Sequence, residues 1–389
     1  MSQTSSPIHE PVQKYQGPTI LSAGHRPFFL LTALSAVVLL PLWLLAFEGE
    51  IELGSQWHAH EMLYGFAGAA IAGFMMAAVP KWTNVDSPVG LKLALFVLLW
   101  IVGRIGMFMA ELDKRFETLA YLDVLFLPVL TIIVARMIIT ARNVRNYVIL
   151  AIFLGLVATN LGYHFYEPNN ALHAGIYMIA TLAALIGGRV VPAFTQNALR
   201  QRGDQDAICA TPAWTDISLL MVMPTLAATQ LFGFEESLTG GLSGFCSLIL
   251  FIRMIGWKSL SSYFDPIVWI LHVAYIWLPI GFGLKALSEL TGTVDSMAGI
   301  HALTTGGIGL LVLAVASRAA LGHSGRELKA SGLTVLSYVL VIASAILRVL
   351  ADTSEMIVLS GALWVLGYGL FAIVYLPILL KPRIDGLTG

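Results

Sequence analysis

The chain has 389 residues, of which 57% are hydrophobic and 12% are charged, and its 22 Lys and Arg nearly balance its 23 Asp and Glu, giving a formal net charge of -1. This composition excludes an ordinary soluble domain, in which about 25% of residues are charged. The absence of a basic excess argues against nucleic acid as a partner. Two cysteines, Cys209 and Cys246, are too few for a disulfide framework or a thiolate-held cluster.

The first 26 residues are polar and lack the apolar core and small-residue cleavage site of a signal peptide. We therefore expect a polar cytoplasmic segment at 1–26, one transmembrane domain at 27–380 and a cytoplasmic tail at 381–389. No connection within 27–380 is long enough to form a soluble domain.

Twelve apolar runs approach the roughly 20 residues that a helix needs to cross a bilayer. The sequence thus predicts an all-α polytopic transmembrane bundle of about 12 helices. The predicted spans are 27–47, 57–79, 91–110, 119–140, 147–166, 171–191, 213–232, 239–257, 267–289, 297–316, 332–350 and 356–380.

Lys and Arg accumulate in cytoplasmic loops, so their distribution predicts the orientation of the bundle. With both termini placed in the cytoplasm, 17 of the 22 Lys and Arg residues fall on the cytoplasmic side. The five on the other side are Arg104, Lys114, Arg115, Lys285 and Arg348. Because the predicted spans cover most of the chain, we expect the lipid bilayer to be its main partner.

Five of the nine histidines fall in the outer third of the predicted bundle: His58, His60, His164, His173 and His301. Imidazole near a bilayer is costly unless it is paired or ligated, and it commonly binds haem iron, copper and zinc. A metal site is one interpretation. The alternative is a set of interfacial side chains hydrogen-bonded to water or neighbouring helices.

Spacing within the helices refines this interpretation. His58 and His60 are about 200° apart around a regular helix, so they cannot both face one metal. They would serve different centres, or one would support the other. His173 and Tyr177 share a helix face, where the tyrosine could supply a proton or an electron or could simply pack.

Several other polar residues could serve such a centre. Arg104 and Asp123 lie at similar depth and could form an ion pair, and Arg104 or Arg348 could contact a haem propionate. Glu61 adjoins His60 and could orient it or carry protons. His272, on the inner side, could ligate a second haem or form a structural hydrogen bond.

Five stretches of the sequence resemble the NnrS family of bacterial membrane proteins. They are Gly24-His25-Arg26-Pro27-Phe28-Phe29-Leu30; Trp57-His58-Ala59-His60-Glu61-Met62, running on to Val79-Pro80-Lys81-Trp82-Thr83; Gly188-Arg189-Val190-Val191-Pro192-Ala193-Phe194-Thr195; Leu271-His272-Val273-Ala274-Tyr275; and His301-Ala302-Leu303-Thr304 through Arg318 to Arg326. The family usually has an aromatic residue where this chain has His25, so no ligand role is carried to His25.

The resemblance implies a bacterial inner-membrane protein with haem b and copper, linked to nitric oxide metabolism, denitrification and nitrosative stress. A fainter likeness connects the chain to the catalytic subunits of haem-copper oxidases and nitric oxide reductases. In those subunits, residues at places comparable to His60, His173 with Tyr177, and His301 hold the metals. The adjacent His-His pair expected on helix 7 is absent here, and helix 10 carries one histidine rather than two.

The resulting hypothesis is a protein that binds, and could reduce, nitric oxide near the periplasmic face, as a nitric oxide reductase-like oxidoreductase. It takes His60 and His301 as haem ligands, His58, His164 and His173 as copper ligands, and Tyr177 and Glu61 for proton delivery. A quinol or a cytochrome would donate electrons. The alternatives are a non-enzymatic nitric oxide sensor or sink, and a copper or haem transporter.

Overall fold

Helices make up the regular structure of the protein. The computed structural model describes residues 15–386, and no strand occurs in that range. A long apolar segment satisfies its own backbone hydrogen bonds in a bilayer only when it is helical. The predicted all-α class is therefore confirmed.

The helices follow one another with short connections. In chain order they are η1 (Thr19–Leu21), α1 (His25–Phe47), α2 (Ser55–His60), η2 (Glu61–Ala67), α3 (Gly68–Thr83), α4 (Leu91–Leu112), η3 (Lys114–Phe116), α5 (Glu117–Ala120), η4 (Asp123–Leu125), α6 (Phe126–Thr140), η5 (Val144–Asn146), α7 (Tyr147–Phe165), α8 (Pro168–Gln201), α9 (Ala213–Leu231), α10 (Glu236–Met254), η6 (Ile255–Trp257), η7 (Ser259–Ser262), α11 (Pro266–Thr291), α12 (Ser296–His301), η8 (Ala302–Gly309), α13 (Leu310–His323), α14 (Gly332–Leu350) and α15 (Ser354–Leu380).

Eleven helical segments in the described part are long and apolar enough to cross a membrane, so the chain is a multi-pass membrane protein. Consecutive helices merge into single segments, such as α2, η2 and α3 in Ser55–Thr83. The twelfth predicted span, 213–232, corresponds to α9, which is less apolar because it carries Asp216 and Gln230. α9 packs against α8 and α10, and Asp216 forms an ion pair with the buried Arg253 of α10.

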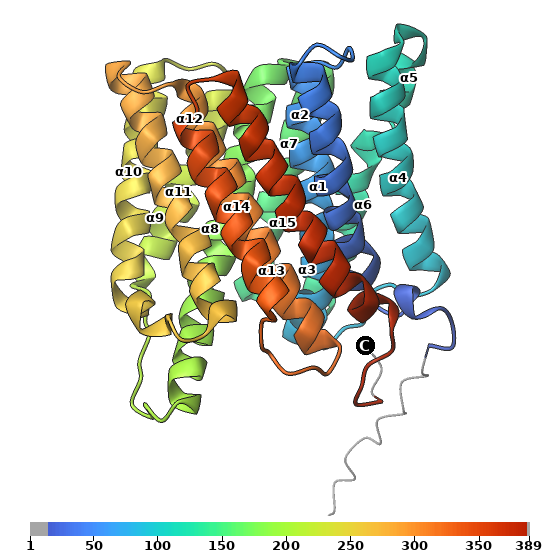
Figure 1. Cartoon of the computed structure of the whole chain (residues 1–389), viewed down its shortest axis with the longest axis vertical. Coiled ribbons are helices and arrows are strands. Elements are labelled where there is room, and N and C mark those ends of the chain that lie inside the picture. Colours follow the sequence, from blue (N-terminus) through green and yellow to red (C-terminus); the bar gives the residue numbers. More distant parts are fainter. Residues whose placement is uncertain (1–14, 387–389) are drawn as a thin grey trace, which may run out of the picture.

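Three segments form the centre of the bundle. Ser55–Thr83, Pro168–Gln201 and Ser296–His323 have 83%, 78% and 72% of their apolar window buried, whereas α1, α14 and α15 have 33%. Figure 1 shows the helices running roughly side by side, with α14 and α15 in front of α8 and α13. Four of the five outer histidines lie on these three central segments.

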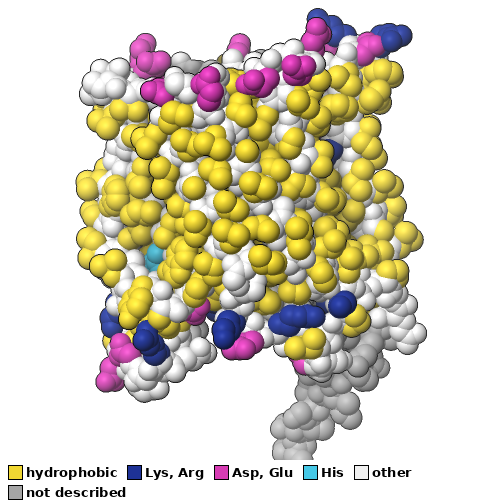
Figure 2. Space-filling view, in the orientation of Figure 1, with side chains coloured by type: hydrophobic (Ala, Val, Ile, Leu, Met, Phe, Trp, Pro, Cys, Tyr) yellow, Lys and Arg dark blue, Asp and Glu magenta, His cyan; other side chains and the backbone are white. Residues whose placement is uncertain are grey.

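The two ends of the bundle differ in charge. Figure 2 shows most of the visible Asp and Glu side chains along one end, most of the Lys and Arg along the other, and a hydrophobic belt between them. We call them the acidic end, which includes the loops 48–54, 232–235, 292–295 and 351–353, and the basic end, which includes the loops 84–90, 141–146, 202–212 and 324–331.

Both described ends of the chain lie at the basic end. Arg26 Nη1, at the start of α1, donates hydrogen bonds to the carbonyls of Leu379 (2.7 Å) and Lys381 (2.8 Å), at the end of α15. This is the arrangement of a bundle with an even number of crossings. The cytoplasmic placement of the termini and the boundaries of the predicted segments 1–26 and 381–389 stay predictions, and residues 1–14 and 387–389 lie outside the described range.

Two wide helical turns interrupt the central segments. η2 and η8 are π-helices, and each begins directly after a histidine, His60 and His301 respectively. A π-helix forms i→i+5 hydrogen bonds, which widens the turn, and such segments are frequent at functional sites. The two stretches thus mark where α2 and α12 depart from regular helix geometry.

Candidate functional site

A cavity of about 510 Å³ lies among the central helices toward the acidic end. This volume is within the roughly 300–1,000 Å³ typical of small-molecule and cofactor sites. Three of the five outer histidines line it, and we call it the histidine cavity, defined by His58, His173, His301 and Arg348. Its walls are largely apolar, with Leu40, Leu44, Met62, Phe66 and Ile176 among them.

The ring of His301 is held in one orientation by its own helix. Its Nδ1 lies 2.9 Å from the carbonyl oxygen of Met297, one turn earlier. A carbonyl only accepts hydrogen bonds, so Nδ1 carries the proton and Nε2 keeps its lone pair. Histidines that bind metals commonly donate their other ring N–H to a backbone carbonyl in this way.

Two further groups of the cavity wall lack hydrogen-bond partners. The ring of His58 stacks on Trp43 with centroids 4.7 Å apart, and its buried Nδ1 has no partner in the described part of the chain. Trp364, also in the wall, has a buried Nε1 without a partner among residues 15–386. Unsatisfied buried polar atoms are rare in folded proteins, and a ligand is one explanation for them.

Arg348 supplies the positive charge of the cavity. It projects from the last turn of α14 and forms no ion pair with any carboxylate of the described residues. Ser55, Gln56 and Asn169 line the cavity at the same end. The cavity is therefore apolar at depth and polar, with one unpaired guanidinium, toward the acidic end.

The other two outer histidines belong to a separate site, which we call the charged group. It is formed by residues of α2, η2, α4, η4 and α7. Its members are His60, Glu61, Arg104, Asp123, Asn160 and His164. Asp123 Oδ2 lies 3.2 Å from His60 Nε2 and 3.4 Å from His164 Nε2, and it accepts a hydrogen bond from Asn160 Nδ2 (2.9 Å). The side chains of His60 and Asp123 are fully buried.

Arg104 joins the two carboxylates of the charged group. Its Nη1 donates to Glu61 Oε1 (2.7 Å), and its Nη2 forms an ion pair with Asp123 Oδ1. The sequence predicts the pairing of Arg104 with Asp123, and the structure confirms it. Arg104 therefore binds Glu61 and Asp123 and does not line the histidine cavity. A haem propionate in that cavity would not contact it.

Close packing of α4 against α5 and η4 makes this pairing possible. A Cβ added at Gly106 would lie 2.2 Å from the carbonyl oxygen of Leu119, and one at Gly103 would lie 3.1 Å from Cα of Asp123. Only glycine lets the two backbones approach this closely. Arg104, between the two glycines, is thereby placed beside Asp123.

The charged group has the geometry of a possible metal site. One ligand atom each from His60, Asp123 and His164 lies within 4.8 Å of the others. Ligands about 2.0–2.1 Å from a tetrahedral metal stand about 3.3 Å apart, close to the observed 3.2 and 3.4 Å. Glu61 Oε1, 3.2 Å from His60 Nδ1, can accept the ring proton and leave Nε2 free for a metal.

The charged group has more acidic than basic side chains, so an additional cation would balance it. The group contains two carboxyl side chains, Glu61 and Asp123, against one guanidinium, Arg104. A buried uncompensated charge is costly. The group can therefore hold a metal ion or a proton on an imidazole, and His60, with acceptors near both ring nitrogens, suits either.

The model of the NnrS protein family matches residues 19–383. The chain belongs to the NnrS family. The sequence-based identification is therefore confirmed, and the NnrS match includes both histidine sites. Among curated proteins, no match to the chain is found.

Two predicted site residues of this NnrS protein line neither site. Tyr177 is fully buried against Phe282, one turn below His173, and its Oη has no hydrogen-bond partner within the described range. His272 lies in the basic half, where its Nε2 is 2.7 Å from Thr195 Oγ1. Because that hydroxyl donates to the Val191 carbonyl, it accepts from His272 Nε2, which supports a structural role.

The structure groups the histidines differently from the sequence-based hypothesis. His60 does not line the cavity that His301 lines, and His164 is not in the cavity with His58 and His173. The 200° separation of His58 and His60 is the signal that anticipates two sites. Nothing in the sequence indicates that Asn160 and Trp364 take part, because their positions depend on tertiary packing.

Proposed function

We propose that this chain is a haem- and copper-containing membrane protein that binds nitric oxide in the histidine cavity. One observation carries the proposal: the Met297 carbonyl fixes the His301 ring so that a free imidazole nitrogen belongs to a largely apolar cavity of cofactor size. Family membership and the five outer histidines support the same interpretation.

The residues of the histidine cavity suit haem b. Haem is a flat apolar macrocycle with two carboxylates, and histidine is a common axial ligand. His301 would hold the haem iron, His58 and His173 are the other imidazoles available in the same cavity wall, and Arg348 would bind a propionate through its fork of donors. When bound, haem would supply an iron centre that takes up nitric oxide and exchanges electrons.

The charged group suits copper. Its two imidazoles and one carboxylate are donors that fit copper or zinc better than magnesium or calcium. We therefore assign His60 and His164, together with Asp123, to the copper and place His58, His173 and His301 at the haem. Glu61 would orient His60, and Arg104 would hold the two carboxylates in place.

Reduction is a further step of the proposal. Two nitric oxide molecules yield nitrous oxide and water when two electrons and two protons are supplied. Tyr177 follows His173 by one helical turn and could pass protons toward the cavity, whereas Glu61 faces the charged group. A quinol or a cytochrome would be the electron donor.

The acidic end would face the periplasm of a bacterial cell, with the basic end in the cytoplasm. The grouping of Lys and Arg at one end of the bundle supports this orientation. Both proposed cofactor sites would then lie toward the periplasmic face.

The test is an absorption spectrum of the purified protein, with a pyridine haemochrome assay and copper analysis, before and after dithionite and nitric oxide. We expect haem b and copper in a fixed ratio and a shift of the Soret band with nitric oxide. Nitric oxide consumption with an electron donor would separate turnover from a sink. A protein that stays colourless and metal-free after reconstitution would overturn the proposal in favour of a transporter.

A further inference from the structure

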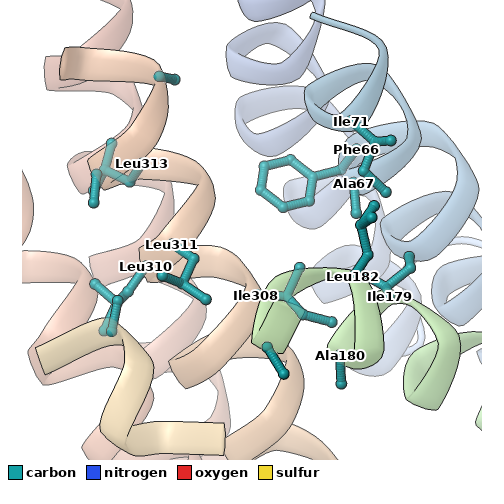
Figure 3. Packing of buried hydrophobic residues seen from close by; sticks show 14 of the residues in the cluster. Phe66, Ala67, Ile71, Ile179, Ala180, Leu182, Ile308, Leu310, Leu311 and Leu313 are labelled. Atoms are coloured by element: carbon teal, nitrogen blue, oxygen red, sulfur yellow. The ribbon is translucent and has the colours of Figure 1, made fainter. Parts of the chain in front are cut away.

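A second, smaller cavity adjoins the histidine cavity on the side of the basic half of the bundle. It has a volume of about 100 Å³ and shares two wall residues, Ala67 and Ile308, with the histidine cavity. Its other walls come from α1, α3, α8, α11 and α13. Figure 3 shows part of this region, with Phe66, Ala67 and Ile71 on one side, Ile179 and Leu182 on α8, and Ile308 and Leu311 on the η8–α13 segment.

Every residue that lines this cavity is apolar or glycine. A buried water needs two to four polar partners, which these side chains cannot supply, so the cavity favours apolar contents. Its volume of about 100 Å³ is too small for a whole lipid chain or for a quinone ring with its tail. An apolar protein cavity of about 150 Å³ binds benzene or xenon, which sets the scale for the contents.

The two cavities differ in what they can admit. The histidine cavity reaches the acidic end through Ser55, Gln56, Asn169 and Arg348, which can hold water and exchange protons. The smaller cavity has no such groups, and its partly exposed walls Phe74, Val190 and Val315 open toward the hydrophobic belt. A small uncharged molecule favours such an apolar environment over water, whereas an ion or a proton carrier does not.

We propose that the smaller cavity is a binding site for small uncharged gas molecules, which it holds beside the histidine cavity and passes to it. The role in delivery rests on the proposed function, because it requires a gas-binding metal in the adjacent histidine cavity. The binding of gas in the smaller cavity does not depend on the proposed function. Nitric oxide would thus approach from the apolar interior, and protons from the acidic end.

Ala67 and Ile308 line both cavities, so a route from one cavity to the other would run past them. Each belongs to a π-helical segment, η2 or η8, so these segments carry both the preceding histidine and a wall of the passage. The methyl side chain of Ala67 leaves room that a larger side chain would fill. Because Ala67 also lines the histidine cavity, transfer is tested at Val312, which lines the smaller cavity only.

Occupancy can be tested with xenon, an inert apolar probe. Anomalous diffraction from xenon-pressurised crystals of the full protein should place xenon among Ala67, Leu182 and Ile308. Val312→Trp, which fills the smaller cavity only, should remove it. The matched control Val339→Trp, at an exposed position on α14, should keep it. The absence of xenon from the unmodified protein would overturn the proposed site.

Delivery can be tested by the kinetics of nitric oxide and carbon monoxide binding to the reduced holoprotein. Val312→Trp should lower the association and dissociation rate constants several-fold while Kd stays unchanged, because a pathway affects both directions equally. Val339→Trp should match the unmodified protein. Unchanged rates in a variant that no longer binds xenon would refute delivery. If xenon binds but the unmodified protein binds neither gas at a metal, the proposed function fails and the gas site stands.

Discussion

The two histidine sites lie on opposite faces of one central segment, Ser55–Thr83, and are built in different ways. In the histidine cavity, His58 and His301 each keep a ring nitrogen that no described side chain engages, and Arg348 forms no ion pair with the described residues. In the charged group, His60 and Asp123 are fully buried and contact several partners each.

The histidine cavity has room for a ligand as large as a cofactor, whereas the charged group has room for a single ion. A neutral imidazole at an apolar cavity costs little, whereas a buried carboxylate requires a cation nearby. The cavity should therefore tolerate substitution without loss of fold. The charged group should not.

The largest expected effect follows from removing the guanidinium of the charged group. Arg104→Met would leave Glu61 and Asp123 buried without their cation, which costs about 3–5 kcal/mol of unfolding free energy. Thermal unfolding in detergent measures the loss. The control Arg115→Met breaks an exposed ion pair with Asp113 and should have no measurable effect. Equal effects of the two variants would show that the charged group is not a buried unit.

A second prediction concerns metal affinity at the charged group. Glu61→Gln weakens the support of His60, and loss of such a support typically lowers metal affinity about 10- to 100-fold. Competition against a copper chelator measures this change. Glu117→Gln, an exposed carboxylate near the same end, should leave copper affinity unchanged. An unchanged affinity in Glu61→Gln would mean that Glu61 serves only Arg104.

In the cavity, Arg348→Gln should weaken haem retention. A hydrogen bond to a charged group contributes about 1.5–3 kcal/mol, which corresponds to roughly 10- to 100-fold faster haem loss. Transfer of haem to apomyoglobin reports the rate, and Lys329→Gln at the basic end is the control. Copper content should stay the same in both variants. Haem loss at the unmodified rate would remove Arg348 from the cofactor site.

The smallest effect is expected at His272, which belongs to neither site. His272→Asn should lose the hydrogen bond to Thr195, at a cost of about 1 kcal/mol. The haem and copper content per protein should not change. A fall in haem content would instead support a second haem in the basic half.

Much of the fold follows from the sequence because hydropathy and the distribution of positive charge act locally along the chain. Some spans are predicted within a few residues, as for 91–110 against α4, whereas α8 continues ten residues beyond the predicted end at 191. α9 is harder, since the charge of Asp216 is compensated only by Arg253 of the next helix. The wide turns η2 and η8 have the same apolar content as regular helix, so no hydropathy signal marks them.

The candidate site is predicted in its residue types and less in its grouping. The spacing of His58 and His60 separates them, but the partner of each depends on which helix packs against which face. His60 meets Asp123 and Asn160, and His58 meets Trp43, through contacts between distant parts of the chain. Such contacts have no local pattern, which is why the sequence-based division of ligands differs from the grouping in the structure.

The most direct test of two separate cofactor sites is the haem and copper content of His301→Ala and His60→Ala beside the unmodified protein. We predict that His301→Ala loses haem and keeps copper, and that His60→Ala loses copper and keeps haem. Loss of haem in His60→Ala with haem retained in His301→Ala would contradict the division of the ligands, and the cavity would then have another occupant.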